Sequence, residues 1–381
     1  MKKAFAAAAI AATLLANAPL GFIQPAHAAT PAAYKIGVTY PRTGPLAGAA
    51  DSALNGAKLA VEDINRRGGV KGHPLELVIE DSQGTPQGGV AAMRKVVQSD
   101  GVQAVLTIFT NVVAAQIPLA DELKIPTLST VEAPNLFTKS EYSFAHASTL
   151  TQVAPHLRDY WKAGGYKRVF AFFGNNAYGK AYAPGVKVVA QQAGAEYDEA
   201  FLDMTASDYR GVIARAKQFN PDAILVGAQG STAESTVIRQ LREMGLTAKL
   251  FNASNFYYDK PWRNAVGSYA EGMIYAGLNV DESVPSGKAF AAAYRAKENL
   301  DPGYQAAEAY DIIHMFAHAI EKSQYKGEAI RGVLTSLRGL PSVFGGTINM
   351  AADNYTIETA VGLWEVTAND KLRRAPLPRR K

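Results

Sequence analysis

Short apolar runs alternate with longer amphipathic stretches along most of the chain. The apolar runs predict buried strands at 34–38, 75–81, 102–109, 125–129, 168–173 and 222–227. The stretches between them predict helices at 51–67, 86–99, 112–123, 178–193, 209–219 and 233–244. Gly68-Gly69 and Gly245 follow two of these helices, as glycine often does at a helix end.

Strands separated by helices are typical of right-handed βαβ units and mainly parallel sheets. The pattern restarts near residue 168 after a first run of similar length. We therefore predict an α/β protein with two doubly wound parallel-sheet lobes. The length of 381 residues and the 48% apolar content are sufficient for two such cores.

Charge and cysteine content exclude several classes of protein. The chain has no cysteine, which rules out a disulfide scaffold, a thiolate zinc site, an iron–sulfur cluster and a cysteine nucleophile. The net charge of +5 comes from the ends: without Lys2, Lys3 and residues 371–381, 31 basic residues stand against 34 acidic ones. A basic face for nucleic acid is therefore not expected, and 371–381 is predicted to be a disordered basic tail.

The N-terminus has the pattern of a secretory signal peptide. A basic start at Lys2 and Lys3 precedes an alanine- and leucine-rich run, and Ala26-His27-Ala28 fits the small-x-small cleavage site. The alternative, an uncleaved membrane anchor, is disfavoured because Asn17, Pro19, Gly21 and Pro25 interrupt the run. We predict cleavage after Ala28 and export to a bacterial periplasm.

Motifs for catalysis are incomplete. The segment 174–181 (GNNAYGKA) matches a phosphate loop except that Ala181 replaces the magnesium-binding hydroxyl. His314 and His318 could share a helix face, but Met315 replaces the glutamate of a hydrolytic zinc helix. The patterns GxSxG and GxGxxG are absent. We predict no enzyme activity, no metal and no cofactor.

An ordered set of segments resembles the leucine/isoleucine/valine-binding family of periplasmic receptors, which serve ABC importers. The set includes KIGVTYPRTGP, LNGAKLAVEDINRRGGVKGHPLELVIEDS, RVFAFFGNNAYGKAY and YQAAEAYDIIHMFAHAIEKS, and it covers nearly the whole mature chain. The resemblance implies a type I bilobed receptor with three crossings between lobes, near 143–147, 277–281 and 344–349. The first lobe would be 34–145 plus 281–344, and the second 147–278 plus 349–370.

Ligands of such sheets bind beyond the carboxyl ends of the strands, where polar loops gather here. The resemblance implies that the ligand carboxylate is held by the loops 109–112 and 129–132, and that Tyr178 covers the ligand. As an alternative, Tyr178 could serve local packing. The candidate ligand-binding residues are Thr43, Ala49, Phe109, Thr110, Asn111, Ser129, Thr130, Glu132, Tyr178, Gln229 and Ser254.

Two departures from the family pattern leave the ligand open. Ser254 stands where the family commonly supplies an acid for the ligand ammonium group, and Gln229 or Gly230 replaces a tyrosine. Glu132 could supply the acid from the first lobe, or it could be a solvated loop residue. Ala49 replaces a bulky aromatic, which suggests room for a larger ligand.

The sequence leaves three hypotheses about the function of the protein. The protein binds a branched-chain or other apolar amino acid, with Glu132 as the ammonium partner. It binds an aromatic or other organic carboxylate, or an amide, without an amine. A secreted enzyme is the minor alternative. The resemblance implies a membrane permease and its ATPases as partners, no nucleic acid, and a monomer.

Overall fold

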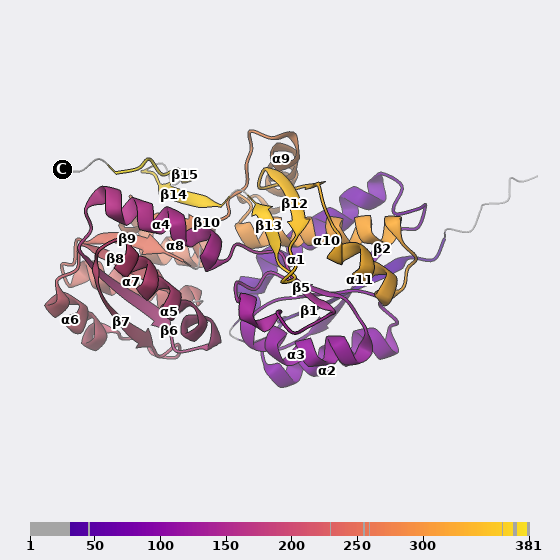
Figure 1. Ribbon diagram of the computed structural model, residues 1–381, viewed down its shortest axis with the longest axis horizontal. Coiled ribbons are helices and arrows are strands. Elements are labelled where there is room, and N and C mark those ends of the chain that lie inside the picture. The colour runs from indigo at the N-terminus through magenta and orange to yellow at the C-terminus, as the bar shows by residue number, and fades with distance from the viewer. Residues whose placement is uncertain are drawn as a thin grey trace, which may run out of the picture. The chain divides into compact units, whose positions relative to one another are not determined.

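Two mainly parallel sheets, each in its own lobe, organise the protein in the computed structural model (Figure 1). The structure describes residues 31–44, 46–228, 230–253, 256–258, 260–359, 361–368 and 372–378. The predicted signal peptide, residues 1–28, lies outside the described residues. The prediction of an α/β protein with parallel sheets is confirmed.

The first sheet has the order β2-β1-β3-β4-β5, and all its strands are parallel. Its strands are β1 (Tyr34–Tyr40), β2 (Leu75–Asp81), β3 (Val105–Thr107), β4 (Thr127–Ser129) and β5 (Ser143–Ala145). The helices of this lobe are α1 (Ala47–Arg66), α2 (Pro86–Arg94) with its π-helical extension η1 (Lys95–Ser99), α3 (Thr110–Leu123), the 3-10 turn η2 (Pro134–Leu136), α9 (Pro285–Glu298), α10 (Tyr304–Lys322) and α11 (Gly327–Thr335).

The second sheet has the order β15-β14-β10-β9-β8-β6-β7. The parallel strands are β6 (Arg168–Gly174), β7 (Glu196–Leu202), β8 (Ala223–Gly227), β9 (Lys249–Asn252) and β10 (Ile274–Gly277), and the antiparallel ones are β14 (Gly362–Val366) and β15 (Leu372–Arg374). Its helical elements are α4 (Leu150–Gly164), α5 (Ala177–Gln192), α6 (Arg210–Phe219), α7 (Ser231–Glu243), η3 (Phe256–Tyr258), α8 (Lys260–Val266) and η4 (Gly267–Ala270).

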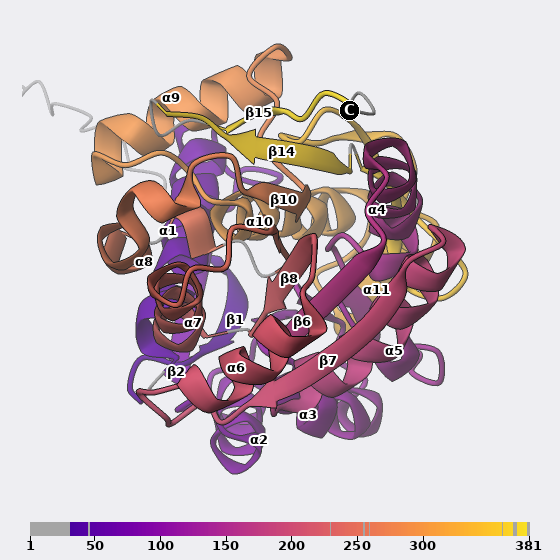
Figure 2. The ribbon, with the colours of Figure 1, turned by 90° about the vertical axis from the view of Figure 1, so that its left-hand side faces the viewer.

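Strand β6 explains why the second sheet is covered on both faces. Its alternate residues Val169 and Phe173 pack with α4 and α5, whereas Phe170 and Phe172 pack with α6, α7 and α8. Figure 2 shows α4 and α5 on one side of this sheet and α7 and α8 on the other. A strand that is buried on both faces has a continuous apolar sequence rather than an alternating one.

In the first lobe, the helices α1 and α10 pack with their backbones in contact. The close approach occurs at Gly56, where an added Cβ would lie 2.0 Å from the carbonyl oxygen of Ala306. Only glycine fits at such a point, because any side chain would push the two helices apart. The contact fixes the first turns of α10 against the body of the lobe.

The chain passes between the lobes three times. The first passage, at residues 146–149, joins β5 to α4, and the second, at 278–284, joins β10 to α9. A small antiparallel sheet of β11 (Leu340–Pro341), β12 (Gly346–Met350) and β13 (Thr356–Thr359) then precedes β14. Ile348 and Met350 lie in the core of the first lobe, so the third passage follows β13 instead of falling at the predicted 344–349.

The basic tail is also more ordered than predicted. Residues 371–381 were expected to be disordered, but Leu372–Arg374 form β15 against β14. The Arg373 guanidinium donates to Glu365 at 2.7 Å, and Arg374 lies over the ring of Trp364. Two basic residues of the tail, Arg373 and Arg374, thus contact residues of β14. No described helix has the length and apolar character needed to cross a membrane.

Candidate ligand-binding site

Three buried hydroxyl groups without partners lie at the carboxyl edge of the first sheet. Tyr40 ends β1, Thr110 follows β3, and Ser129 ends β4, three strands that are neighbours in the sheet. The side chains are at most 4% exposed, and none of the hydroxyl groups has a hydrogen-bond partner among the described residues. Buried polar atoms in proteins are nearly always paired, so this edge is suited to a ligand or to ordered water.

The start of α3 brings backbone donors to the same edge. Phe109, the residue before the helix, has a φ of 71°, which is unusual for a residue other than glycine. Thr110 and Asn111 then form the first turn, whose backbone N–H groups favour an anion. The Asn111 side chain donates to the carbonyl oxygen of Gly84 at 2.8 Å, which ties this turn to the loop after β2.

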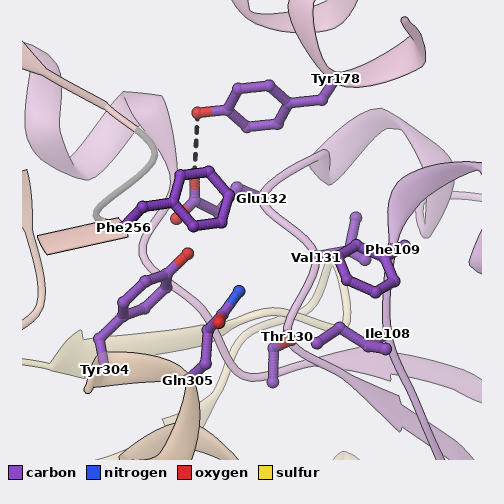
Figure 3. A pocket seen from close by; sticks show the side chains of 9 residues that line it. All are labelled: Ile108, Phe109, Thr130, Val131, Glu132, Tyr178, Phe256, Tyr304 and Gln305. Carbon is purple, nitrogen blue, oxygen red and sulfur yellow. Dashed lines mark hydrogen bonds between the residues drawn. The ribbon is translucent and has the colours of Figure 1, made fainter. Parts of the chain in front are cut away.

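A small inner pocket, with a cavity volume of about 20 Å³, lies next to this edge. Figure 3 shows its side chains, which come from both lobes. The pocket is lined by Ile108, Phe109, Thr130, Val131, Glu132, Tyr178, Phe256, Tyr304 and Gln305. One acid thus stands in a site whose other members are mainly aromatic and apolar.

Glu132 is the chemically distinctive residue of the inner pocket. Loss of water around its carboxyl group raises its pKa to about 8, while the Tyr178 hydroxyl acts in the opposite direction. That opposing contact is long, at 3.5 Å, and the same hydroxyl group donates to the carbonyl oxygen of Ala253 at 3.1 Å. Glu132 is therefore a weakly partnered acid that can change protonation state near neutral pH.

Aromatic side chains surround this acid. Figure 3 shows the Glu132 carboxyl group between the hydroxyl groups of Tyr178 and Tyr304, and Phe256 lines the same pocket. Burial, and then the charge of Glu132, raise the pKa of both tyrosines well above the ordinary value, so both stay neutral donors. A carboxylate beside aromatic rings is a favourable environment for a cationic group, because both the charge and the ring faces attract it.

A second acid, Glu308, lies on α10 one helical turn after Tyr304. Glu308 is fully buried, and neither of its carboxyl oxygens has a hydrogen-bond partner among the described residues. Burial raises its pKa well above the ordinary value, and the charges of Glu132 and Asp311 add to this effect. Glu308 is thus held as a neutral acid behind the pocket wall that Tyr304 and Gln305 form.

An outer cleft with a cavity volume of about 860 Å³ shares Phe109, Tyr178 and Phe256 with the inner pocket. The starts of α3, α5 and α7 all reach it. Its lining comprises Leu46, Gly48, Phe109, Thr110, Asn111, Asn176, Ala177, Tyr178, Met204, Thr205, Gly230, Ser231, Thr232, Ala233, Phe256 and Pro261. Apolar side chains therefore alternate with small and hydroxyl-bearing ones along its walls.

The predicted site residues fall into three groups: those at the cavities or the adjoining sheet edge, those elsewhere in the first lobe, and those outside the described residues. Phe109, Thr110, Asn111, Thr130, Glu132 and Tyr178 line the inner pocket or the outer cleft, and Ser129 lies directly before Thr130 at the same sheet edge.

The other candidates are placed differently. Thr43 lines neither cavity. Its hydroxyl group donates a hydrogen bond to Asp81 at 2.6 Å. Ala49 belongs to the first turn of α1. Gln229 and Ser254 lie outside the described residues.

Several lining residues were not predicted from the sequence. Tyr304 and Gln305 begin α10, far along the chain from the loops of the first sheet, and Phe256 belongs to the short η3 turn. The turn Asp301-Pro302-Gly303 indicates a helix start at Tyr304. No sequence signal indicates that this helix start reaches the loops after β3 and β4.

Comparison with known proteins identifies the family. A family profile described as periplasmic binding protein matches residues 33–371. A Leu/Ile/Val-binding protein homolog 3 from Brucella melitensis is 28% identical over 80% of this chain and 82% of its own length. The Leu/Ile/Val-binding protein BraC3 from Rhizobium johnstonii is 28% identical over 88% of this chain and 91% of its own length.

Solved structures share the fold. The branched-chain amino acid transporter substrate binding protein LivJ from Streptococcus pneumoniae, in complex with isoleucine, has a TM-score of 0.80 at 24% identity, covering 91% of this chain and 99% of its own. A solute binding protein from R. palustris in complex with benzoate also has a TM-score of 0.80, at 18% identity, covering 91% and 96%. The bilobed α/β architecture, the ligand-sized outer cleft and the profile match lead to one conclusion: this chain belongs to the periplasmic binding protein family, whose members are substrate-binding proteins.

Proposed function

We propose that the protein is the receptor of an ABC importer for an amino acid with an apolar side chain. It is exported by a signal peptide cleaved after Ala28, acts as a monomer without catalysis, and delivers its ligand to a membrane permease and its ATPases. The names of its relatives and of the isoleucine-bound structural neighbour support this class of ligand.

The observation that carries the proposal is the position of Glu132 beside hydroxyl and backbone donors. An amino acid needs an acceptor for its ammonium group and donors for its carboxylate. Glu132 offers the acceptor within the inner pocket, while Thr130 and the first turn of α3 offer donors nearby. Both kinds of partner are needed because a buried charge without one is costly.

Closure of the two lobes would complete the site. Tyr178 and Phe256 come from the second lobe and line the same pocket as Glu132 from the first. A ligand that contacts both lobes binds the closed form better and so increases its population. The permease then distinguishes loaded from empty receptor by the relative positions of the lobes.

A second candidate ligand is an organic carboxylate or amide without an amine. The pKa of about 8 at Glu132 favours it, because a protonated carboxyl group can donate a hydrogen bond to a ligand oxygen. In this case Glu132 stays neutral in the complex, and no ammonium group is needed.

The test is calorimetric titration of the mature protein after unfolding and refolding to remove carried ligand. The ligands are leucine, phenylalanine and their deaminated analogues. The proposal expects that only the amines bind, and that Glu132→Gln weakens them at least ~30-fold, the loss of a charged partner. Glu76→Gln is the matched control, because Glu76 is an exposed glutamate on β2 of the same lobe. Binding of the deaminated acids alone would overturn the amino-acid assignment in favour of the second candidate.

A further inference from the structure

The outer cleft is larger than a branched-chain side chain requires. Its cavity volume of about 860 Å³ lies near the upper end of the range of roughly 300–1,000 Å³ that is common for small-molecule sites. The inner pocket, with a cavity volume of about 20 Å³, has room for about one water molecule or a small polar group. If the polar head of the ligand lies at the mouth of the inner pocket, with its ammonium group toward Glu132, its side chain points into this wider cleft.

The wall that the first lobe contributes to the cleft contains a glycine, Gly48. Gly48 is the second residue of α1, is exposed, and lines the cleft. A Cβ built at this position would meet no atom within 4 Å, so the space in front of it is open. The neighbouring Leu46 contributes an apolar surface to the same wall.

The wall on the second lobe has a matching glycine. Gly230 precedes α7 in an extended conformation, with a φ of −158°, that any residue can adopt. A Cβ at this position would lie 2.4 Å from the terminal methyl carbon of Met204, which also lines the cleft. The absence of a side chain at Gly230 lets the flexible Met204 lie against the backbone, where it can adapt to an apolar group.

Closure of the lobes would bring these two walls toward each other. Bulky residues at Gly48 and Gly230 would then fill the space between them, whereas glycines leave it to the ligand. The remaining lining between the walls includes Phe256, Pro261 and Ala233, which suit an apolar or aromatic group.

We infer that the cleft selects ligands with a side chain larger than that of leucine, aromatic or extended and apolar, and that Gly48 and Gly230 are the residues that set this size. The inference rests on the proposed function for the orientation of the ligand, with the polar head at the mouth of the inner pocket. Gly48 and Gly230 act by leaving room, so their substitution should alter size preference without removing any polar contact.

The experiment is a size series measured by calorimetry: alanine, leucine, phenylalanine and tryptophan, together with their deaminated analogues. Wild-type protein should bind the aromatic members at least ~10-fold more tightly than leucine, the scale on which apolar pockets discriminate size. Gly48→Leu should weaken the aromatic members ~10-fold or more and leave leucine within ~3-fold, because the added side chain occupies the space that the ring would use.

Gly211→Leu provides the matched control. Gly211 is likewise the second residue of a helix, α6, is exposed, and has no atom within 4 Å of an added Cβ. It does not line either cavity, so its substitution should leave the whole series unchanged. Thermal melting of both variants verifies that they fold.

The outcomes separate this inference from the proposed function. Leucine binding as tightly as phenylalanine and tryptophan, or Gly48→Leu weakening every ligand equally, would overturn the size selection while the amino-acid receptor stands. Binding of the deaminated series alone would overturn the amino-acid assignment, and the size ranking within that series would still decide the inference.

Discussion

Proton release on ligand binding is the sharpest prediction that the site makes. The pKa of Glu132 is about 8 in the empty protein, so at pH 7 the carboxyl group is about 90% protonated. An ammonium group within contact distance lowers the pKa of an acid by about 1–3 units, here to about 6. Binding of an amino acid at pH 7 should therefore release about 0.8 protons.

The same shift sets the pH dependence of affinity. Only the ionised carboxylate pairs with the ligand, so the affinity rises with pH while Glu132 is still protonated in the empty protein. With pKa values of about 8 and about 6 in the two states, the affinity should increase about 25-fold from pH 6 to pH 8. The ligand ammonium group stays charged throughout this range, so the slope reports on the protein.

Calorimetry in two buffers measures the effect directly. Phosphate and Tris differ in ionisation enthalpy, and the difference between the observed binding enthalpies gives the number of protons exchanged. Glu132→Gln should abolish both the proton release and the pH slope. Tight binding with no proton release, or an affinity that falls as the pH rises through 8, would refute the reasoning and assign Glu132 the role of a neutral donor.

Further predictions concern stability, each measured by denaturant unfolding. The raised pKa of Glu132 destabilises the folded state progressively as the pH rises from 4.5 to about 8, so Glu132→Gln should raise the free energy of unfolding by about 1–3 kcal/mol at pH 8 and by little at pH 4. An equal gain at both pH values would contradict this. Thr149→Ala should cost about 1 kcal/mol, because it removes the reciprocal cap that Thr149 and Gln152 form at the start of α4. An unchanged midpoint would show that the cap is not needed. Phe251→Ala should cost about 3–5 kcal/mol, since its ring packs edge-on against Trp161 within a buried cluster; a loss below about 1 kcal/mol would mean that the cluster repacks.

Six strands and six helices could be predicted because the sequence of each shows its own burial; they are β1 to β4, β6, β8, α1 to α3 and α5 to α7. Strand β6 is apolar throughout since both of its faces are covered, and the predicted range 168–173 differs from the observed one by a single residue. Strand β7 was not predicted. Its sequence EYDEAFL carries three acids because it is the edge strand of its sheet, and polar edge strands lack the apolar signal of central ones.

The late passage between the lobes and strand β15 could not be predicted for a different reason. Both depend on pairing between distant segments. Strand β12 contributes Ile348 and Met350 to a core whose other members lie far away in sequence, and β15 is ordered by pairing with β14. Local composition, which made residues 371–381 look like a disordered tail, contains no information about such a partner.

For the candidate site, the sequence predicted which loops lie at the sheet edge. It did not predict which residues from distant parts of the chain pack against those loops. Thr110, Thr130 and Glu132 follow strands of one parallel sheet, so their shared edge was predictable from topology. Tyr304 arrives from α10 and Phe256 from η3, and only the folded chain brings them to Glu132. Thr43 also follows a strand, β1, but its hydroxyl group donates a hydrogen bond to Asp81.

The contact between Gly56 and Ala306 limits how this receptor can be engineered as a sensor. Ala306 is two residues from Tyr304 and next to Gln305, so this close contact between α1 and α10 lies behind the pocket wall. A methyl group added at Gly56 would shift that wall without altering any residue that the ligand touches. Libraries built for a new dynamic range should therefore keep Gly56, although it is not a recognition residue.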